Sequence, residues 1–555
     1  MHNYDAIILG IGGSDHDFSS AIIKYGKVIV AIEDERITRT KYGRGQWYSI
    51  PTKPSLEYCL KAAEINLAKI NYVFSNLHLE KRAFDQKIGK IINISHHLAH
   101  AGAAFYPSPF QEAAIVIIDG AGSRISCKPD VVELETISIG YGKHNKINID
   151  TTQTGKRYIA TCYWKYMASD SIGSFYQAIT EIIGFGSRGA GKTMGIASYG
   201  TNKLYKQMKE FVQILPEGRF IFNPYDGIFD WATDKLNKAS NHFMIRAELA
   251  AAAQKIHEEA VLNVMSYVKS KNKFVYLCFG GGSALNSVTN SKILDSSLFN
   301  KIYIFPATSD SGTSIGSALY GYYHYLENKR TPNNENGIGA LAYTGTAYSK
   351  RSLLSTLNNY PVSYYKSSDL YTEVAWKLVN NEVIGWFQGC SEIGPRALGN
   401  RSILANPTSY KMRDHINLNI KLRESFRPLA PVVITDRYQE YFDTNFPSPY
   451  MLMVAPVKLK YRQKLAAITH VDGTSRLQTV DKSTNDKLYK LILAFEKLTG
   501  FPILLNTSFN IQGMPIVETP SQAVECFLKT QLDCLVMGDF IIEKHTPWNK
   551  RNVSS

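Results

Sequence analysis

Short apolar runs bounded by glycine and polar residues open the chain, with the lengths of strands rather than of helices. Asp5–Gly10 predicts a buried strand, and a turn that contains glycine and acidic residues follows it. Ser20–Lys24 and Val28–Glu33 predict a hairpin. The chain is therefore expected to begin with a strand, a glycine-rich turn and a hairpin, and the glycines would let the turn approach a phosphate closely.

The same unit recurs later in the chain. Ala113–Ile118 predicts a buried strand that ends in Asp119-Gly120-Ala121-Gly122, and Val131–Ile139 predicts another strand arm. Two copies of one strand–turn–hairpin unit predict a duplicated α/β fold. Sugar kinases, actin and Hsp70 share that plan and bind nucleotide between two lobes, although a fold alone does not assign a function.

The middle of the chain predicts a long helix over Ala247–Val268 and a strand over Phe274–Phe279. Gly280-Gly281-Gly282 follows that strand and precedes a helix start at about Asn286. Free backbone amides at such a place attract phosphate, although a tight turn explains the glycines as well. Residues 326–350 are polar, with Asn and Gly clusters, and predict a linker before a second domain.

Gly186–Thr193 (GSRGAGKT) matches the phosphate-loop pattern G-x-x-x-x-G-K-[ST]. Such a loop must follow a buried strand and open a helix. Here it follows Ser171–Phe185, whose apolar residues recur at helical spacing, and it precedes Met194–Gly200, which is bounded by glycines. We therefore interpret the segment as a flexible loop that lines a cleft, without a dependable helix after it, and not as a P-loop.

Bulk properties narrow the function classes. The 555 residues predict at least two domains, and 44% hydrophobic with 12% aromatic residues excludes a disordered chain. The net charge of +14 favours anionic ligands, but no long basic run points to nucleic acid. The seven cysteines contain no C-x-x-C pair, which indicates a reduced, cytoplasmic protein. We expect no signal peptide and no apolar span that crosses a membrane.

Histidines gather at His96, His97 and His100. In a helix, His96 and His100 lie one turn apart on the same face, where two imidazoles can chelate a metal. Asp119 at a strand end can supply a third ligand, and Asp310, on a similar strand-end loop, can complete the set. These donors allow iron, manganese, cobalt or zinc, and a structural cluster without metal is the alternative.

The last third of the chain carries cations in short motifs, GPRALGNRSIL (394–404), KLRESFRPLAP (421–431) and SRLQ (475–478). Arginine forks suit phosphate and carboxylate oxygens, although any one of these arginines could be an ordinary surface charge. NTSFN (506–510) adds amide and hydroxyl groups after a strand predicted at Ile503–Leu505. The cations are Arg396, Arg401, Lys421, Arg423, Arg427 and Arg476.

Eight motifs occur in a fixed order: HHLAHA, IDGAG, GAGKTMGIASYG, GGGSALN, the SDSG loop, GPRALGNRSIL, FRPLAP and NTSFN. Together, over nearly the whole chain, they resemble the O-carbamoyltransferases of the NodU/CmcH family, which includes the tobramycin carbamoyltransferase type. The resemblance implies an α/β protein with two domains. Residues 1–345 would form a Kae1-like domain of the sugar kinase/actin/Hsp70 (ASKHA) type, and residues 346–555 a YrdC-like α/β domain.

The resemblance also implies a mechanism. The YrdC-like domain would form carbamoyl-adenylate from carbamoyl phosphate and ATP with Mg²⁺. The Kae1-like domain would transfer the carbamoyl group to a hydroxyl of a small-molecule acceptor, such as a sugar, an antibiotic or another natural product. A homodimer is compatible with this plan.

The implied site residues fall into two groups. The implied metal ligands hold Fe²⁺, with another divalent metal as the alternative, and are His96, His100, Asp119 and Asp310. The residues implied to bind the carbamoyl phosphate, the nucleotide and the adenylate phosphate are Gly280, Gly281, Gly282, Asn286, Arg396, Arg401, Lys421, Arg427, Arg476, Asn506 and Ser508.

Catalytic residues are predicted at the opening unit. His16 lies on the first turn and is a candidate base for the acceptor's proton, with a structural role as the alternative. Lys41 belongs to a charged segment that could line the cleft, with a solvated loop as the alternative. One departure from the family concerns Ser123, since many relatives carry an acid there; this puts one cleft contact in doubt. The alternative functions are a threonylcarbamoyl-type enzyme that modifies tRNA and a non-catalytic nucleotide- or metal-binding protein.

Overall fold

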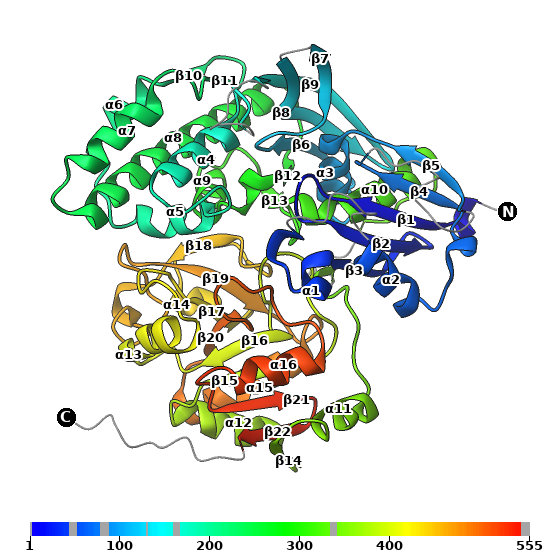
Figure 1. Cartoon of the computed structure of the whole chain (residues 1–555), viewed down its shortest axis with the longest axis vertical. Coiled ribbons are helices and arrows are strands. Elements are labelled where there is room, and N and C mark those ends of the chain that lie inside the picture. Colours follow the sequence, from blue (N-terminus) through cyan, green and yellow to red (C-terminus); the bar gives the residue numbers. More distant parts are fainter. Residues whose placement is uncertain are drawn as a thin grey trace. The chain divides into compact units, whose positions relative to one another are not determined.

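The computed structural model describes residues 3–43, 53–77, 88–128, 131–158, 167–332 and 341–544. The chain divides into two compact units (Figure 1). The first unit consists of Met1–Asp34, Tyr42–Leu341 and Leu452–Val454. The second consists of Glu35–Lys41, Ala342–Met451 and Ala455–Ser555. Each unit therefore includes a short segment that is remote in sequence from the rest of it.

The first sheet of the first unit has the strand order β3-β2-β1-β4-β5. Its strands are β1 (Ile7–Gly12), β2 (Ser19–Lys24), β3 (Lys27–Glu33), β4 (Tyr72–Ser75) and β5 (Lys90–Asn93). β1, β2 and β3 pair antiparallel, whereas β1, β4 and β5 pair parallel. The predicted strand, turn and hairpin at the start of the chain are thus confirmed.

The second sheet repeats this plan. It has the order β13-β12-β6-β8-β7, and β9 also pairs with β8. Its strands are β6 (Glu112–Ile118), β7 (Arg124–Lys128), β8 (Val131–Lys143), β9 (Lys146–Tyr158), β12 (Tyr276–Gly280) and β13 (Lys301–Tyr303). β6, β8 and β9 pair antiparallel, and β6, β12 and β13 pair parallel. The predicted duplication is therefore present in the topology and register of both sheets.

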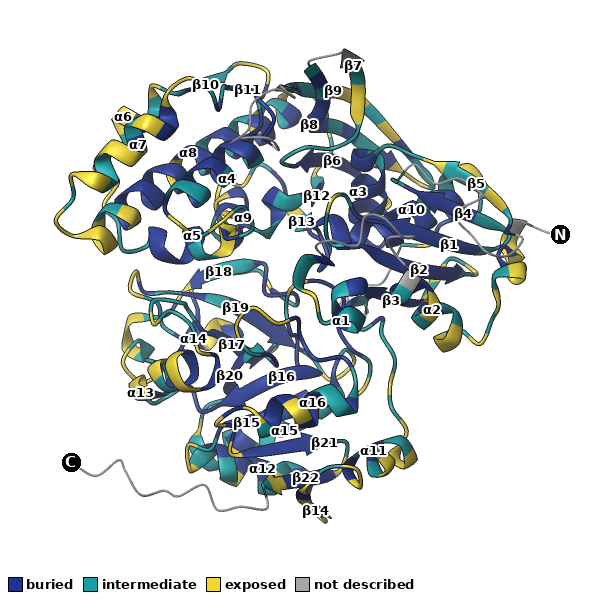
Figure 2. Cartoon of the chain, in the orientation of Figure 1, coloured by how far each residue is buried: buried dark blue, intermediate teal, exposed yellow. Residues whose placement is uncertain are grey.

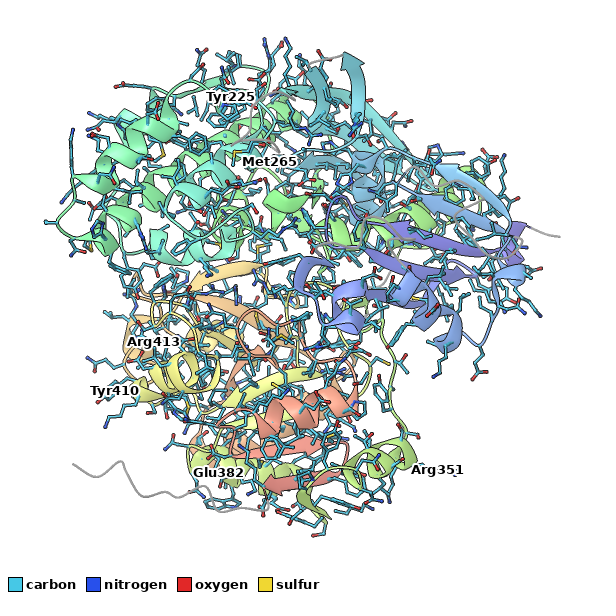
Figure 3. The ribbon with its side chains drawn as sticks, in the orientation of Figure 1. Tyr225, Met265, Arg351, Glu382, Tyr410 and Arg413 are labelled. Atoms are coloured by element: carbon cyan, nitrogen blue, oxygen red, sulfur yellow. The ribbon has the colours of Figure 1, made fainter. Side chains whose placement is uncertain are left out.

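Helices cover these sheets, and apolar side chains bury their contact faces (Figure 2). Other helices pack around α8, whose Met265 is fully buried, and the hairpin β10 (Val212–Leu215) and β11 (Arg219–Phe222) lies beside it (Figure 3). The helices of the unit are α2 (Lys53–Ala62), α3 (His96–Phe105), α4 (Ile172–Ile182), α5 (Ala190–Ala197), α6 (Tyr205–Lys209), α7 (Ile228–Asn237), α8 (His242–Lys271), α9 (Ser287–Asp295) and α10 (Thr313–Tyr320).

The second unit is built on one mixed sheet with the order β14-β22-β21-β15-β16-β20-β17-β19-β18. Apolar cores lie on both faces of the sheet, one of them under α12 and α15. Its strands are β14 (Val362–Lys366), β15 (Ile384–Phe387), β16 (Arg401–Ala405), β17 (Ala430–Ile434), β18 (Met453–Pro456), β19 (Thr474–Val480), β20 (Ile503–Ser508), β21 (Cys534–Met537) and β22 (Phe540–Lys544). Its helices are α11 (Lys350–Leu357), α12 (Leu370–Val379), α13 (Tyr410–Asp414), α14 (Tyr438–Tyr441), α15 (Asp486–Thr499) and α16 (Pro520–Leu528).

Three sequence-based expectations need correction. GSRGAGKT does follow a helix, α4, as predicted, but it leads into helix α5 rather than a flexible loop, because Met194 and Ile196 are buried by tertiary packing. Asn506–Ser508 does not follow a strand but lies within β20, paired with β16. The predicted linker 326–350 begins as part of the first unit, since the buried Arg330 guanidinium donates to four carbonyls after α3; residues 333–340 lie outside the described residues.

None of the described helices combines the length and apolar character needed to span a membrane.

Helix α10 packs so closely against α3 and β1 that glycine is required at the points of contact. A Cβ on Gly316 would lie 1.9 Å from the Ala99 carbonyl oxygen, and a Cβ on Gly10 would lie 1.9 Å from the Ser314 carbonyl oxygen. Because α3 carries His96 and His100, this close packing also sets the position of the two imidazoles.

We predict that Gly316→Ala destabilises the protein by about 1–3 kcal/mol, since the added methyl group meets backbone that cannot yield. Gly191→Ala in α5 is the matched control: no atom lies within 4 Å of the added Cβ, so alanine should stabilise that helix by up to about 1 kcal/mol. Urea unfolding followed by circular dichroism measures both. Equal effects of the two substitutions would contradict the packing described here.

Candidate metal centre and anion site

The start of α3 is fixed by two hydroxyl groups. Ser95 caps the helix, and its Oγ accepts from the Leu98 amide at 3.1 Å. Ser123 Oγ accepts from the His96 amide at 2.7 Å, which satisfies a second amide of the first turn. The residue that departs from the family pattern therefore has a structural contact in this chain: it holds the helix that carries the histidines.

Four predicted metal ligands converge in the first unit. His96 Nε2 lies 3.2 Å from Asp119 Oδ2 and 3.4 Å from Asp310 Oδ1, and His100 Nε2 lies 3.6 and 3.5 Å from the same two oxygens. The two Nε2 atoms are 3.0 Å apart. All four side chains are buried, and their ligand atoms lie within 4.8 Å of one another. Two nitrogen and two oxygen donors at this separation fit a divalent metal ion.

The charges of this cluster depend on one another. Burial lowers the pKa of His96, but Asp310 and Asp119 outweigh it and raise that pKa to about 10. Burial and the Asp310 charge raise the pKa of Asp119, but hydrogen bonds from His100 and His96 outweigh them and hold it below its usual range. Both carboxylates are therefore ionised, and a buried pair of carboxylates requires a cation beside it.

His16 lies at the edge of this cluster, with Nε2 3.8 Å from Asp310 Oδ2 and Nδ1 3.3 Å from Asp17. Burial lowers the pKa of His16, but the charges of Asp17 and Asp310 raise it to about 9. These two carboxylates favour the protonated imidazole, and the role of His16 as the base for the acceptor's proton stays a prediction. Ser14, which the sequence did not single out, donates a short hydrogen bond to Asp310.

The triple glycine lies against the metal cluster. Gly282 donates its amide to Asp119 Oδ1 at 3.1 Å, and Gly281 has a φ of +88°. A Cβ on Gly281 would lie 2.4 Å from the Ile118 carbonyl oxygen, so only glycine fits there. Asn286 caps α9 by accepting from the Thr289 amide at 3.1 Å. These contacts orient Asp119 and start a helix, whereas phosphate binding by this loop stays a prediction.

The second unit brings together cations from three motifs. Burial lowers the pKa of Arg476 well below its ordinary value, and the charges of Arg396, Arg423 and Arg427 lower it further. Burial, followed by the Arg427 charge, lowers the pKa of Arg423 to about 9. Four guanidinium groups this close repel one another and therefore favour an anion among them. Arg423 belongs to the cluster although the resemblance alone did not mark it.

Lys421 is 1% exposed and lies beside this cluster. Its Nζ donates to Ser508 Oγ at 3.0 Å and to Asn510 Oδ1 at 2.5 Å, which links it to β20 and to the loop that follows. Burial lowers its pKa well below the ordinary value, and the charge of Arg423 adds to that effect. The predicted residues Lys421 and Ser508 are thus in contact. Asn510, which was not predicted as a site residue, also contacts Lys421, and its only signal in the sequence is its position in the NTSFN motif.

Two predicted ligand residues, Arg401 and Asn506, have hydrogen-bond partners within the second unit. The fully buried Arg401 guanidinium donates from Nη1 to the Gln388 carbonyl at 2.6 Å and from Nε to the Glu518 carbonyl at 3.3 Å. Asn506 Nδ2 donates to Gln478 Oε1 at 2.6 Å. These contacts hold both side chains in place, and their role in ligand binding stays a prediction.

The loop that precedes β16 is organised by Glu392. Its Oε1 accepts from the amides of Leu398, Asn400 and Arg401 at 2.8, 2.7 and 3.2 Å. This buried carboxylate fixes the GPRALGNR turn that presents Arg396. Lys41, predicted as catalytic, belongs to the second unit rather than to the unit that holds the metal cluster.

Comparison with known proteins adds the family. The chain matches the carbamoyltransferase N-terminus model over residues 75–319 and the carbamoyltransferase C-terminus model over residues 375–544. It is 32% identical to the nodulation protein NolNO of Sinorhizobium fredii, over 96% of this chain and 79% of that protein. It is also 32% identical to an uncharacterized protein of Synechocystis, over 97% of this chain and 96% of that protein.

Among solved structures, full-length HypF in its phosphate- and nucleotide-bound form matches with 13% identity and a TM-score of 0.39, over 59% of this chain and 56% of that chain. The two family models and the relatives that span nearly the whole chain show that this protein belongs to the carbamoyltransferase family and is a transferase enzyme.

Proposed function

We propose that this chain is an ATP-dependent O-carbamoyltransferase that makes carbamoyl-adenylate in its second unit and transfers the carbamoyl group to a small-molecule hydroxyl in its first. The observation that carries the proposal is the cluster of Arg396, Arg423, Arg427 and Arg476 beside Lys421. This cluster of positively charged side chains suits the phosphate groups of carbamoyl phosphate and ATP. Mg²⁺ would bind together with the ATP.

The first half-reaction suits these residues. Water releases phosphate from carbamoyl phosphate, and an oxygen of the resulting carbamate attacks the α-phosphorus of ATP, which expels pyrophosphate. Charge develops on phosphate oxygens in both steps. Arg427 and Arg476 are held in place by the surrounding protein. They would stabilise that charge without rearranging, and this preorganisation lowers the barrier of the reaction.

The second half-reaction is assigned to the first unit. An acceptor hydroxyl attacks the carbamoyl carbon, and AMP leaves. His96, His100, Asp119 and Asp310 would hold Fe²⁺ or another divalent ion, which supplies Lewis-acid stabilisation of negative charge on oxygen. The chain's own contribution is to keep these four side chains buried and converged. The division into a Kae1-like domain over 1–345 and a YrdC-like domain over 346–555 is part of this proposal.

Product analysis tests the reaction class directly. Purified protein is incubated with carbamoyl phosphate, ATP and Mg²⁺ in the absence of acceptor, and the nucleotides are separated by chromatography. AMP or carbamoyl-adenylate together with pyrophosphate, strictly dependent on carbamoyl phosphate, is the expected result. ADP and phosphate would indicate a kinase or an ATPase instead.

Arg427→Ala should lower the rate of pyrophosphate release by about 10- to 100-fold or more, since a charged contact to phosphate is lost. His100→Ala should leave this rate within about 3-fold of wild type, since it removes no cation of the second unit, a difference under 1 kcal/mol. Arg413→Ala in α13 (Figure 3) is a matched control, because this arginine lies in the same unit but not among the four of the cluster. If His100→Ala abolished pyrophosphate release in folded protein, the division of labour would be wrong.

Metal binding gives a prediction that does not depend on turnover. After chelation and reloading with Fe²⁺, the wild-type chain should retain about one metal ion, whereas Asp310→Asn and His100→Ala should retain much less, because each removes one ligand. Elemental analysis of desalted protein measures the ratio. Asp15→Asn provides the control, since it changes a carboxylate of the same region that is outside the converged set. Retention by the ligand variants at the wild-type level would contradict the assignment.

A further inference from the structure

A cavity of about 620 Å³ lies in the first unit, away from the metal ligands. Its walls come from the start of α3, from the hairpin of β8 and β9, and from the end of α10 with the residues that follow it (Figure 1). Protein pockets that hold small molecules have volumes of about 300–1,000 Å³. None of the four metal ligands is among the described residues that line the cavity, so it is a separate space.

The floor of the cavity consists of three buried polar side chains, His97, Glu135 and Ser138. His97 Nδ1 and Ser138 Oγ share a hydrogen bond of 2.7 Å, and Ser138 Oγ lies 3.1 Å from Thr152 Oγ1. Cavities that stay empty in proteins are lined by apolar groups. This polar floor therefore indicates a space that takes up polar molecules rather than a defect in the packing.

The carboxylate of Glu135 is held in a fixed position. Its Oε2 accepts from the His97 amide at 3.2 Å and from the Ser123 amide at 3.0 Å. The other oxygen, Oε1, has no hydrogen-bond partner among the described residues. A ligand that donates to this carboxylate would bind without rearranging it, which limits the entropy lost on binding.

The charge of the lining is negative. Asn148 and Asp150 of β9 are exposed and also line the cavity, so Asp150 adds a second carboxylate to that of Glu135. No lysine or arginine is among the described lining residues. The cavity therefore favours a positively charged ligand, in contrast to the arginine cluster of the second unit.

Two aromatic side chains complete the lining. The rings of Tyr320 and His324 stack with their centroids 4.5 Å apart. His324 Nδ1 accepts from the Ile147 amide at 3.2 Å, and burial, followed by the Lys146 charge, lowers the pKa of His324. The neutral ring thus carries its proton on Nε2, where it is a donor. Stacked rings beside a few fixed polar groups are typical of pockets that orient a small organic ligand.

We propose that this cavity binds a polyhydroxylated small molecule that carries an amine, a compound of the amino-sugar class. The ammonium group would pair with the carboxylates of Glu135 and Asp150. The hydroxyl groups would bond to polar side chains of the lining, among them Ser138 and Asn148, and the apolar face of the sugar ring would contact the aromatic pair. The site is additional to the metal centre and the anion site and does not depend on the reaction proposed for them.

A matched pair of sugars tests the proposal. Glucosamine and glucose have the same size, and only glucosamine is a cation at neutral pH. Saturation-transfer difference NMR with the full chain measures both dissociation constants. Glucosamine should bind with a dissociation constant of about 1 mM and about 5-fold more tightly than glucose, since an ion pair near the surface contributes up to about 1 kcal/mol.

Two variants locate the binding. Asn148→Trp should abolish it, because the larger side chain fills the cavity from an exposed strand position that accepts an aromatic residue. Asp150→Asn keeps the volume and should weaken glucosamine binding about 2- to 5-fold while leaving glucose unchanged. Asp295→Asn is the matched control, since this exposed carboxylate at the end of α9 does not line the cavity.

Equal binding of the two sugars by wild-type protein would overturn the proposal, because the carboxylates would then not select the amine. Wild-type glucosamine binding by Asn148→Trp would also overturn it, since the sugar would lie elsewhere in the protein. Circular dichroism checks that both variants are folded. If Asn148→Trp does not fold, Asp150→Asn decides the question: an effect no larger than that of Asp295→Asn contradicts the site.

Discussion

The site of the first unit depends on two buried carboxylates, Asp119 and Asp310. An ionised carboxylate is stable in a protein interior only if donors and cations surround it. α3 brings the imidazoles of His96 and His100, the triple glycine brings the Gly282 amide, and the first turn brings the Ser14 hydroxyl. Each of these groups arrives on a different element, so the packing of the duplicated sheets and of α3 against α10 serves one electrostatic requirement.

The second unit instead has an excess of positive charge at its candidate site. Arginines from three motifs gather around Lys421, and burial, followed by the repulsion between these charges, lowers the pKa values of Arg423 and Arg476. The buried carboxylate of Glu392 accepts hydrogen bonds from three backbone amides of the loop that presents Arg396. An anion is therefore the natural complement of the cluster, as a cation is of the carboxylate pair.

The carbamoyl transfer through an adenylate that we propose would use both kinds of site. In the activation step the substrates carry phosphates, whose negative charge the arginines can balance. In the transfer step a hydroxyl attacks a carbonyl group, and a metal held by histidine and aspartate would suit that chemistry. The presence of two units in one chain of the carbamoyltransferase family fits this separation of tasks.

The sequence alone determined what depends on local geometry. Apolar runs predicted the strands and their duplication, and the spacing of His96 and His100 predicted one helix face, because the helix and strand periods follow from the local backbone conformation. The tertiary structure alone distinguished Arg401, which is bound to main-chain carbonyls, from Arg427 in the cluster, and it alone placed Lys41 in the second unit. Those outcomes depend on partners far away in sequence. No local pattern encodes which distant carbonyl or charge a side chain will meet, since long-range packing decides it.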